Sequence, residues 1–170
     1  MNAPFTASGA LNASFIALAA ALVLTACSDP PPPPLPEVTF SVDGNSVSAR
    51  PFLHCDVMVT KCDKDDKAPA TLRIAAGKQV RITVPGEVAE SPWSVAVEYK
   101  TAAGEQKEPQ TVATFVPNES HDYTVALPDA GAQLQTVEVK QAGAKQDPAA
   151  AAGDIQLLAR AVWSLRVESS

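Results

Sequence analysis

An alternation of apolar and polar residues near the C-terminus restricts that part of the chain to extended structure. One face of the segment 157–168 would carry Leu157, Ala159, Ala161, Trp163, Leu165 and Val167. The other face is mostly polar, with Leu158 and Val162 as exceptions. A period of two is typical of a half-buried β-strand, and no helical spacing fits these residues better.

The same period recurs along the chain after residue 37. Asp43-Gly44 separates two alternating runs and predicts a tight hairpin turn. Further strands are expected at 71–74, 79–84, 93–100, 111–116, 122–127 and 137–139. About nine short strands predict an all-β fold, specifically an immunoglobulin-like antiparallel β-sandwich.

Three aromatic residues and one Ala-rich stretch complete the expected fold. Trp93 and Tyr123 lie where such a sandwich places core anchors, and Trp163 lies on the apolar face of its strand. We expect residues 142–153 to form a long surface loop between the last two strands. Asp147 and Pro148 could start one helical turn there, and Gly153 could end it.

The N-terminus carries the signature of an exported lipoprotein. The largely apolar run 13–26 is too short to cross a hydrocarbon core of ~30 Å, but it has the length of a signal-peptide core. It ends in Leu24-Thr25-Ala26-Cys27, which resembles a bacterial lipobox. The resemblance implies that residues 1–26 are a lipoprotein signal peptide and that the Cys27 thiol is joined to diacylglycerol. The alternative is a plain secretory signal that leaves this thiol free.

A proline run separates the lipobox from the alternating segments. Six of the seven residues 30–36 are proline, so this stretch is neither helix nor central strand. In polyproline II, residues 28–36 would form a stiff spacer of roughly 28 Å. We therefore expect lipidated Cys27 and a tether at 27–36, followed by a β-sandwich domain at 37–170. This protein would sit at the extracytoplasmic face of the cell membrane.

Two cysteines remain once Cys27 carries lipid. Cys55 and Cys62 of an exported protein should form a disulfide bond. The alternative is a copper or zinc site made of His54, Cys55, Met58 and Cys62, whose softness suits those metals. The spacing of the two cysteines is not that of a zinc ribbon, so we expect no metal and no cofactor.

Charge and motifs limit the function classes. The chain has 13 Lys+Arg and 19 Asp+Glu, a net charge of −6, which opposes nucleic-acid binding. Ser120-His121-Asp122 contains triad residue types, but neighbours on an extended chain point to opposite faces. Glu87 and Glu90 could be imagined as paired carboxylates, but two solvated loop acids before Trp93 explain them far better. The sequence has no nucleophile elbow, zinc-protease motif or phosphate loop, so we do not expect an enzyme.

Several segments together resemble one family over essentially the whole chain after the signal peptide. They are the Cys27 lipobox, the proline tether, Glu37-Val38-Thr39-Phe40, the pair Cys55 and Cys62, Ala89-Glu90-Ser91-Pro92-Trp93, and residues 134–139. The chain is similar to small lipoproteins of mycobacteria, rhodococci and their relatives that are described as a domain of unknown function. The resemblance implies an envelope of the mycolic-acid type and transfers no catalytic residue.

These observations favour a lipid-anchored module that binds or scaffolds an envelope component. Its partners would be the membrane, through the anchor, and an envelope protein or small molecule. Loops at one end of a sandwich usually carry its binding chemistry, so residues 54–69 and 86–92 are the expected contact surface. A metal carrier is the alternative function.

Overall fold

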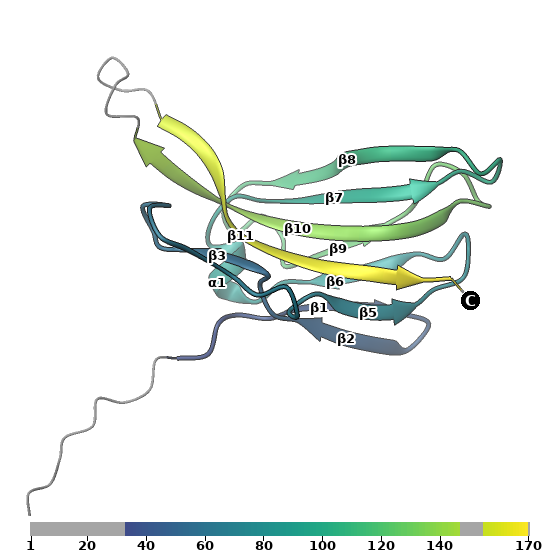
Figure 1. The fold of residues 1–170 in the computed structure, drawn as a ribbon, viewed down its shortest axis with the longest axis horizontal. Coiled ribbons are helices and arrows are strands. Elements are labelled where there is room, and N and C mark those ends of the chain that lie inside the picture. Colours follow the sequence, from purple (N-terminus) through teal and green to yellow (C-terminus); the bar gives the residue numbers. More distant parts are fainter. Residues whose placement is uncertain (1–32, 147–154, 170) are drawn as a thin grey trace, which may run out of the picture. The chain divides into compact units, whose positions relative to one another are not determined.

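The alternating segments form β-strands in a computed structural model, which describes residues 33–146 and 155–169 (Figure 1). The compact unit begins at Pro34. The expected signal peptide at 1–26, Cys27 and residues 28–32 of the expected tether lie outside the described residues. The described elements are β1 (Val38–Val42), β2 (Asn45–Ala49), β3 (Leu53–Cys55), β4 (Cys62–Lys64), β5 (Ala70–Arg73), β6 (Val80–Thr83), α1 (Gly86–Ala89), β7 (Trp93–Lys100), β8 (Gln106–Phe115), β9 (Asp122–Val125), β10 (Gln133–Gln146) and β11 (Ile155–Glu168).

The smaller sheet has the strand order β2-β1-β6-β9, with every neighbouring pair antiparallel. Its first hairpin turns at Asp43 and Gly44, whose φ angles are 49° and 84°. Two consecutive positive φ values are the geometry of a type I′ turn, which matches the twist of the strands beside it. The hairpin predicted from Asp43-Gly44 is therefore confirmed.

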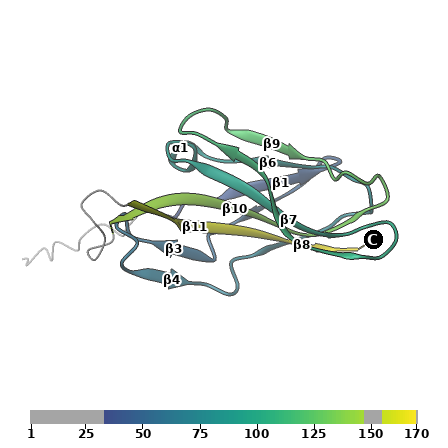
Figure 2. The same cartoon turned by 90° about the horizontal axis from the view of Figure 1, so that it is seen from above.

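The larger sheet has the order β4-β3-β11-β10-β7-β8, and β5 also pairs with β11. The β5–β11 pair is parallel, while the other pairs in this sheet are antiparallel. Along one edge, β11 therefore pairs first with β3 and then with β5. Figure 2 shows the two sheets as separate layers of the sandwich.

The core fills the space between the layers. The side chains of Phe40 and Ile82 from the smaller sheet and of Val95, Val137 and Trp163 from the larger sheet are completely or almost completely buried. Each occupies the inward phase of its strand, as the period of two predicted. The all-β sandwich is confirmed, with the core where the alternation indicated.

The connectivity is immunoglobulin-like. In that fold, strands B and E are neighbours in one sheet, and C, F and G are neighbours in the other. Here β6 and β9 pair in one sheet, and β7, β10 and β11 pair in the other. Trp93 begins β7, the equivalent of strand C, and is buried beside Phe115 at a ring separation of 4.2 Å. The chain's disulfide, however, lies in the β3–β4 hairpin and does not join the two sheets.

Three expectations about local structure were wrong. Residues 86–89 form the helical turn α1 at the start of the expected 86–92 loop. The strand expected at 111–116 is β8, which begins at Gln106 and accommodates Pro109 because it is an edge strand. Residues 142–146 extend β10 as far as Gln146, because residues 155–159 of β11 pair with them. The helical turn expected at 147–153 lies outside the described residues.

Candidate functional site

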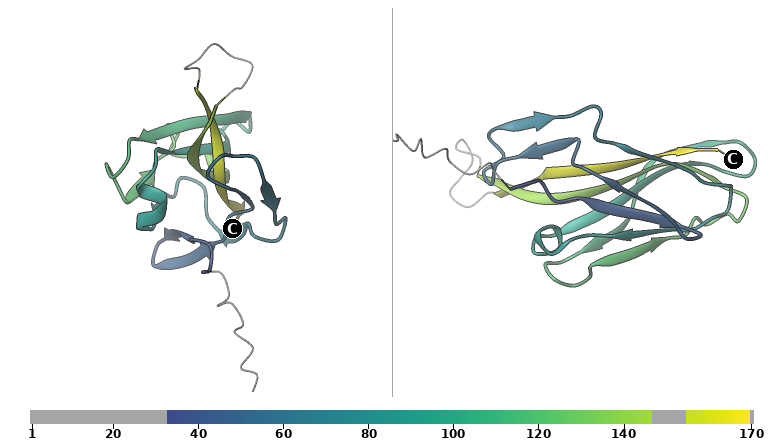
Figure 3. Two further views of the ribbon diagram at one scale, coloured as in Figure 1. Left: turned by 90° about the vertical axis from the view of Figure 1, so that its left-hand side faces the viewer. Right: turned by 90° about the horizontal axis from the view of Figure 1, so that it is seen from below.

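Residues 141–143 of β10 bring the two expected contact segments to the same end of the sandwich. The backbone N–H of Ala142 donates to the carbonyl of Pro92 over 2.8 Å. On the other side, a Cβ atom added at Gly143 would lie 2.8 Å from Cγ2 of Val59. Figure 3 shows the β3–β4 hairpin near the extension of β10 and β11 at this end. The segment 54–69 is not all loop, since it contains the end of β3 and all of β4.

Gln141 fixes α1 against the larger sheet. Its side chain is only 4% exposed, and its Nε2 donates to the carbonyl of Glu87 over 2.7 Å and to that of Val88 over 3.3 Å. A buried amide is tolerated where its polar atoms find partners. Gln141 therefore supplies a donor to the carbonyl of Glu87 and a second donor to that of Val88, which also accepts from the backbone N–H of Ser91 over 3.4 Å.

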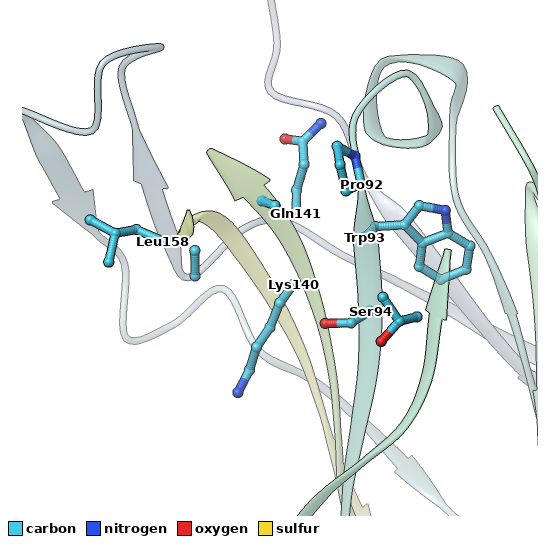
Figure 4. A pocket seen from close by; sticks show the side chains of 9 residues that line it. Pro92, Trp93, Ser94, Lys140, Gln141 and Leu158 are labelled. Carbon is cyan, nitrogen blue, oxygen red and sulfur yellow. The ribbon is translucent and has the colours of Figure 1, made fainter. Parts of the chain in front are cut away.

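A hollow of about 240 Å³ opens beside this contact (Figure 4). In Figure 4, Leu158 lies across β10 from Pro92 and Ser94. The remaining lining comes from Trp93, Thr114, Lys140, Gln141, Ala142 and Ala159. Its volume is below the ~300–1,000 Å³ of a typical small-molecule site. Such a hollow can hold one side chain or a short apolar group of a larger molecule.

A β-bulge in β11 shapes the hollow. Gln141 pairs with Ala161 and Ala142 pairs with Ala159, so Arg160 has no partner residue on β10. The extra residue shifts the alternation and places Leu158 opposite Gly143, and Leu158 is 37% exposed. Arg160 Nε is buried and has no hydrogen-bond partner among the described residues.

The β3–β4 hairpin ends in a turn that a disulfide closes. Cys55 is buried, Cys62 is exposed, and the two are cross-strand partners joined by the bond that the sequence predicted. Asp56 organises residues 56–61, because its carboxylate accepts hydrogen bonds from the hydroxyl and the backbone N–H of Thr60. These hydrogen bonds, the hydroxyl's first, lower the pKa of Asp56 from its ordinary value.

The structure does not gather the alternative metal ligands. Both sulfurs of Cys55 and Cys62 are in the disulfide, so neither offers the thiolate that copper or zinc binds. Met58 is 56% exposed at the tip of the hairpin. Within residues 33–146 and 155–169, no three His, Cys, Asp or Glu side chains form a group that could hold a metal ion.

The triad residue types in sequence do not form a relay. The Ser120 hydroxyl donates to the backbone carbonyl of Asp122 over 2.7 Å. The Asp122 carboxylate instead accepts from Arg81 over 3.2 Å. Glu87 and Glu90 are exposed, at the first turn and the C-cap of α1 respectively.

The tether joins the domain at a defined point. The Trp163 indole N–H donates to the carbonyl of Pro36 over 2.9 Å. Pro34 and Leu35 border a shallow depression together with Pro51 and His54 of the β3 region. No helix of the described residues is long and apolar enough to cross a membrane.

Sequence reasoning missed the part of the hollow that comes from strands. Lys140, Gln141 and Ala142 fell at or beside a segment expected to be loop, and Leu158 was treated as an exception to the alternation. That exception was the available signal, because consecutive apolar residues at 157 and 158 are what a shift of strand phase produces.

Comparison with known proteins gives a family and no relative of established activity. No curated protein and no solved structure matches this chain. A family model described as "Protein of unknown function (DUF2771)" matches residues 31–168, from the proline tether to the end of β11. The chain therefore belongs to the DUF2771 family, whose members share this domain and have no assigned function.

Proposed function

We propose that this protein is a lipid-anchored, extracytoplasmic binding module that acts without catalysis at the outer face of the plasma membrane. The observation that carries the proposal is Leu24-Thr25-Ala26-Cys27 followed directly by the proline run. This order of signal, modified thiol and proline spacer is what a domain tethered to a lipid surface requires. The similarity to lipoproteins of mycobacteria and rhodococci supports an envelope of the mycolic-acid type.

The disulfide and the attachment of the tether agree with this placement. Cys55 and Cys62 pair, as expected of a protein in an oxidising compartment. Pro36 is held by Trp163, so the spacer ends at a fixed point of the sandwich. A rigid link lets the anchor restrict where the domain's binding surface can reach.

The hollow beside Pro92 and Leu158 is the proposed contact point for an envelope component. Its lining is mainly apolar, and Lys140 lies at its edge. An apolar depression with few polar groups favours an aliphatic or aromatic group of the partner. The volume of about 240 Å³ makes that group one part of a larger molecule.

Detergent phase separation tests the anchor. We expect the wild-type protein in the detergent phase and the Cys27→Ala variant in the aqueous phase. A wild-type protein that stays in the aqueous phase would end the anchoring proposal.

Photo-cross-linking tests the contact point. A photoreactive residue at Leu158 should capture an envelope component, and the same residue at Ala103, in the β7–β8 turn, should not. Ala142→Leu should abolish the capture because the larger side chain fills the hollow. Equal capture at both positions, or capture unchanged by Ala142→Leu, would refute binding there.

A further inference from the structure

Exposed apolar side chains of the described residues gather at the end of the sandwich where the tether attaches. Six large apolar side chains are exposed in this part of the chain, and only Val112 lies along an edge strand away from the loops of this end. The five others have exposed fractions between 37% and 67%: Leu35, Val57, Met58, Val116 and Leu158. Single exposed apolar residues need no explanation, but such a gathering marks a contact surface.

The most exposed pair sits at the tip of the β3–β4 hairpin. Val57 is 67% exposed and Met58 is 56% exposed. The next residue, Val59, has a φ of 53°, which a β-branched residue rarely adopts. Backbone in this region is costly and persists where the surroundings enforce it, and it is found most often at functional sites.

Three features hold that tip in place. The disulfide closes its base, and Asp56 accepts hydrogen bonds from Thr60 across it. Val59 packs against Gly143, the partner of Leu158 in the β10–β11 ladder. The turn is therefore held rigidly with Val57 and Met58 exposed to solvent, at the same end of the sandwich as Leu158.

The tether limits how far this end can lie from the anchor. The fixed Pro36 lies nine residues after Cys27, and a fully extended chain of that length spans at most ~32 Å. β1 then runs from Pro36 toward the turn at Asp43 and Gly44, at the opposite end from α1 (Figure 1). The chain thus enters the sandwich from the side that carries the apolar residues.

From these observations we propose that Val57 and Met58 insert into the surface of the lipid layer that holds the anchor. The inference rests on the proposed lipid modification of Cys27. Charge does not supply the attraction, because the chain is acidic and the tip carries one Asp56 against one Lys61. Apolar side chains at the edge of a lipid layer gain from leaving water, and they orient the domain relative to the layer.

Tryptophan fluorescence in vesicles tests the insertion. The full lipid-modified protein, as a Met58→Trp variant, is reconstituted into phosphatidylcholine–phosphatidylglycerol vesicles that carry a nitroxide near the top of the acyl chain. We expect a blue-shifted emission and roughly a twofold or greater quenching, since interfacial side chains reach that depth. Trp93 and Trp163 are at most 1% exposed and add little quenchable background.

Two further variants make the result specific. Val57→Trp should be quenched like Met58→Trp, which guards against a folding defect in either one. Ala103→Trp, at the opposite end of the sandwich, should be quenched no more than the wild-type protein. Quenching at position 58 no greater than at position 103 would overturn the proposal and leave the tip free for a protein partner.

Vesicle flotation separates the two proposals. If the protein floats with the vesicles but the tip is not quenched, the lipid insertion is wrong and the anchor stands. If the protein does not float, the anchor itself is wrong, and the insertion falls with it.

Discussion

Exchanging Gln141 for Glu changes one buried donor into a charge without changing the shape of the side chain. Nε2 of Gln141 donates to the carbonyls of Glu87 and Val88, and the side chain is 4% exposed. An ionised carboxylate has no donor and would face two carbonyl oxygens. Gln141→Leu is the matched control, because it removes the same donors without adding charge.

The expected losses in the free energy of unfolding differ between the two variants by the cost of burying a charge. Gln141→Leu forfeits the hydrogen bonds to the carbonyls of Glu87 and Val88, together about 2–3 kcal/mol of the free energy of unfolding, although the Val88 carbonyl keeps the Ser91 N–H as a partner. In Gln141→Glu, burial should raise the pKa of the introduced carboxyl by about two units, which adds about 3 kcal/mol at neutral pH. The Glu variant should therefore lose about 5 kcal/mol near pH 7.

The direction of the pKa shift determines how the stability of the Glu variant depends on pH. A carboxyl whose pKa is higher in the folded state carries no ionisation penalty below its unfolded value of ~4.3. The penalty grows as pH rises from there to the folded pKa of about 6 and stays constant above it. In acid, the protonated carboxyl can donate one hydrogen bond. The free energy of unfolding of the Glu variant should then be close to that of the Leu variant.

Urea unfolding followed by near-ultraviolet circular dichroism of Trp93 and Trp163 measures these free energies. We expect the two variants to be similar near pH 4 and to separate by about 3 kcal/mol near pH 7. A Glu variant as stable as the Leu variant at neutral pH would refute the buried contact with α1.

Three other perturbations follow from local geometry. Reduction of the disulfide should cost about 2.4 kcal/mol by loop-closure entropy for a sequence separation of 7, measured by urea unfolding with and without reductant. Gly77→Ala should lower the thermal unfolding temperature more than Gly44→Ala does. Both glycines have a positive φ, but only at Gly77 would the new Cβ meet a backbone oxygen, that of Ala130. Asp129 accepts two backbone N–H groups that lower its pKa, so it should stabilise the fold above its ordinary value of 3.8 and lose that effect in acid. Asp129→Asn should weaken that acid dependence in unfolding scans, and an unchanged pH profile would contradict the contact.

Local rules were enough to predict the sandwich and its tight hairpin. Asp43 and Gly44 tolerate the positive φ values that a type I′ turn needs, so two residues specify the β1–β2 register. In β7 and β11, a period of two places Trp93 and Trp163 in the core without any long-range information. The disulfide was predicted from the expectation of export and from the two cysteines that remain besides Cys27.

Pairing between strands that are distant in sequence produced the features that the sequence did not predict. Ala142 and Gly143 have weak strand propensity, yet they extend β10 because β11 provides a partner for each. The strand expected at 111–116 left out residues 106–110, but β8 is an edge strand and therefore accommodates Pro109, which has no backbone donor. The burial of Gln141 depends on α1 packing over it, and no local pattern encodes that contact. The hollow depends on the bulge at Arg160 and was missed for the same reason.

The C-terminal position of β11 has a consequence for how the protein matures. β11 is the only strand that pairs with β5, and it alone connects the β3–β4 hairpin to the rest of its sheet, within the part of the chain that the structure describes. Chains are synthesised from the N-terminus, so three earlier strands must wait for the last segment before the larger sheet can close. While the ribosome still holds this segment, the larger sheet cannot close, and loss of residues 156–168 would leave the β3–β4 hairpin and β5 without their pairing partner in that sheet.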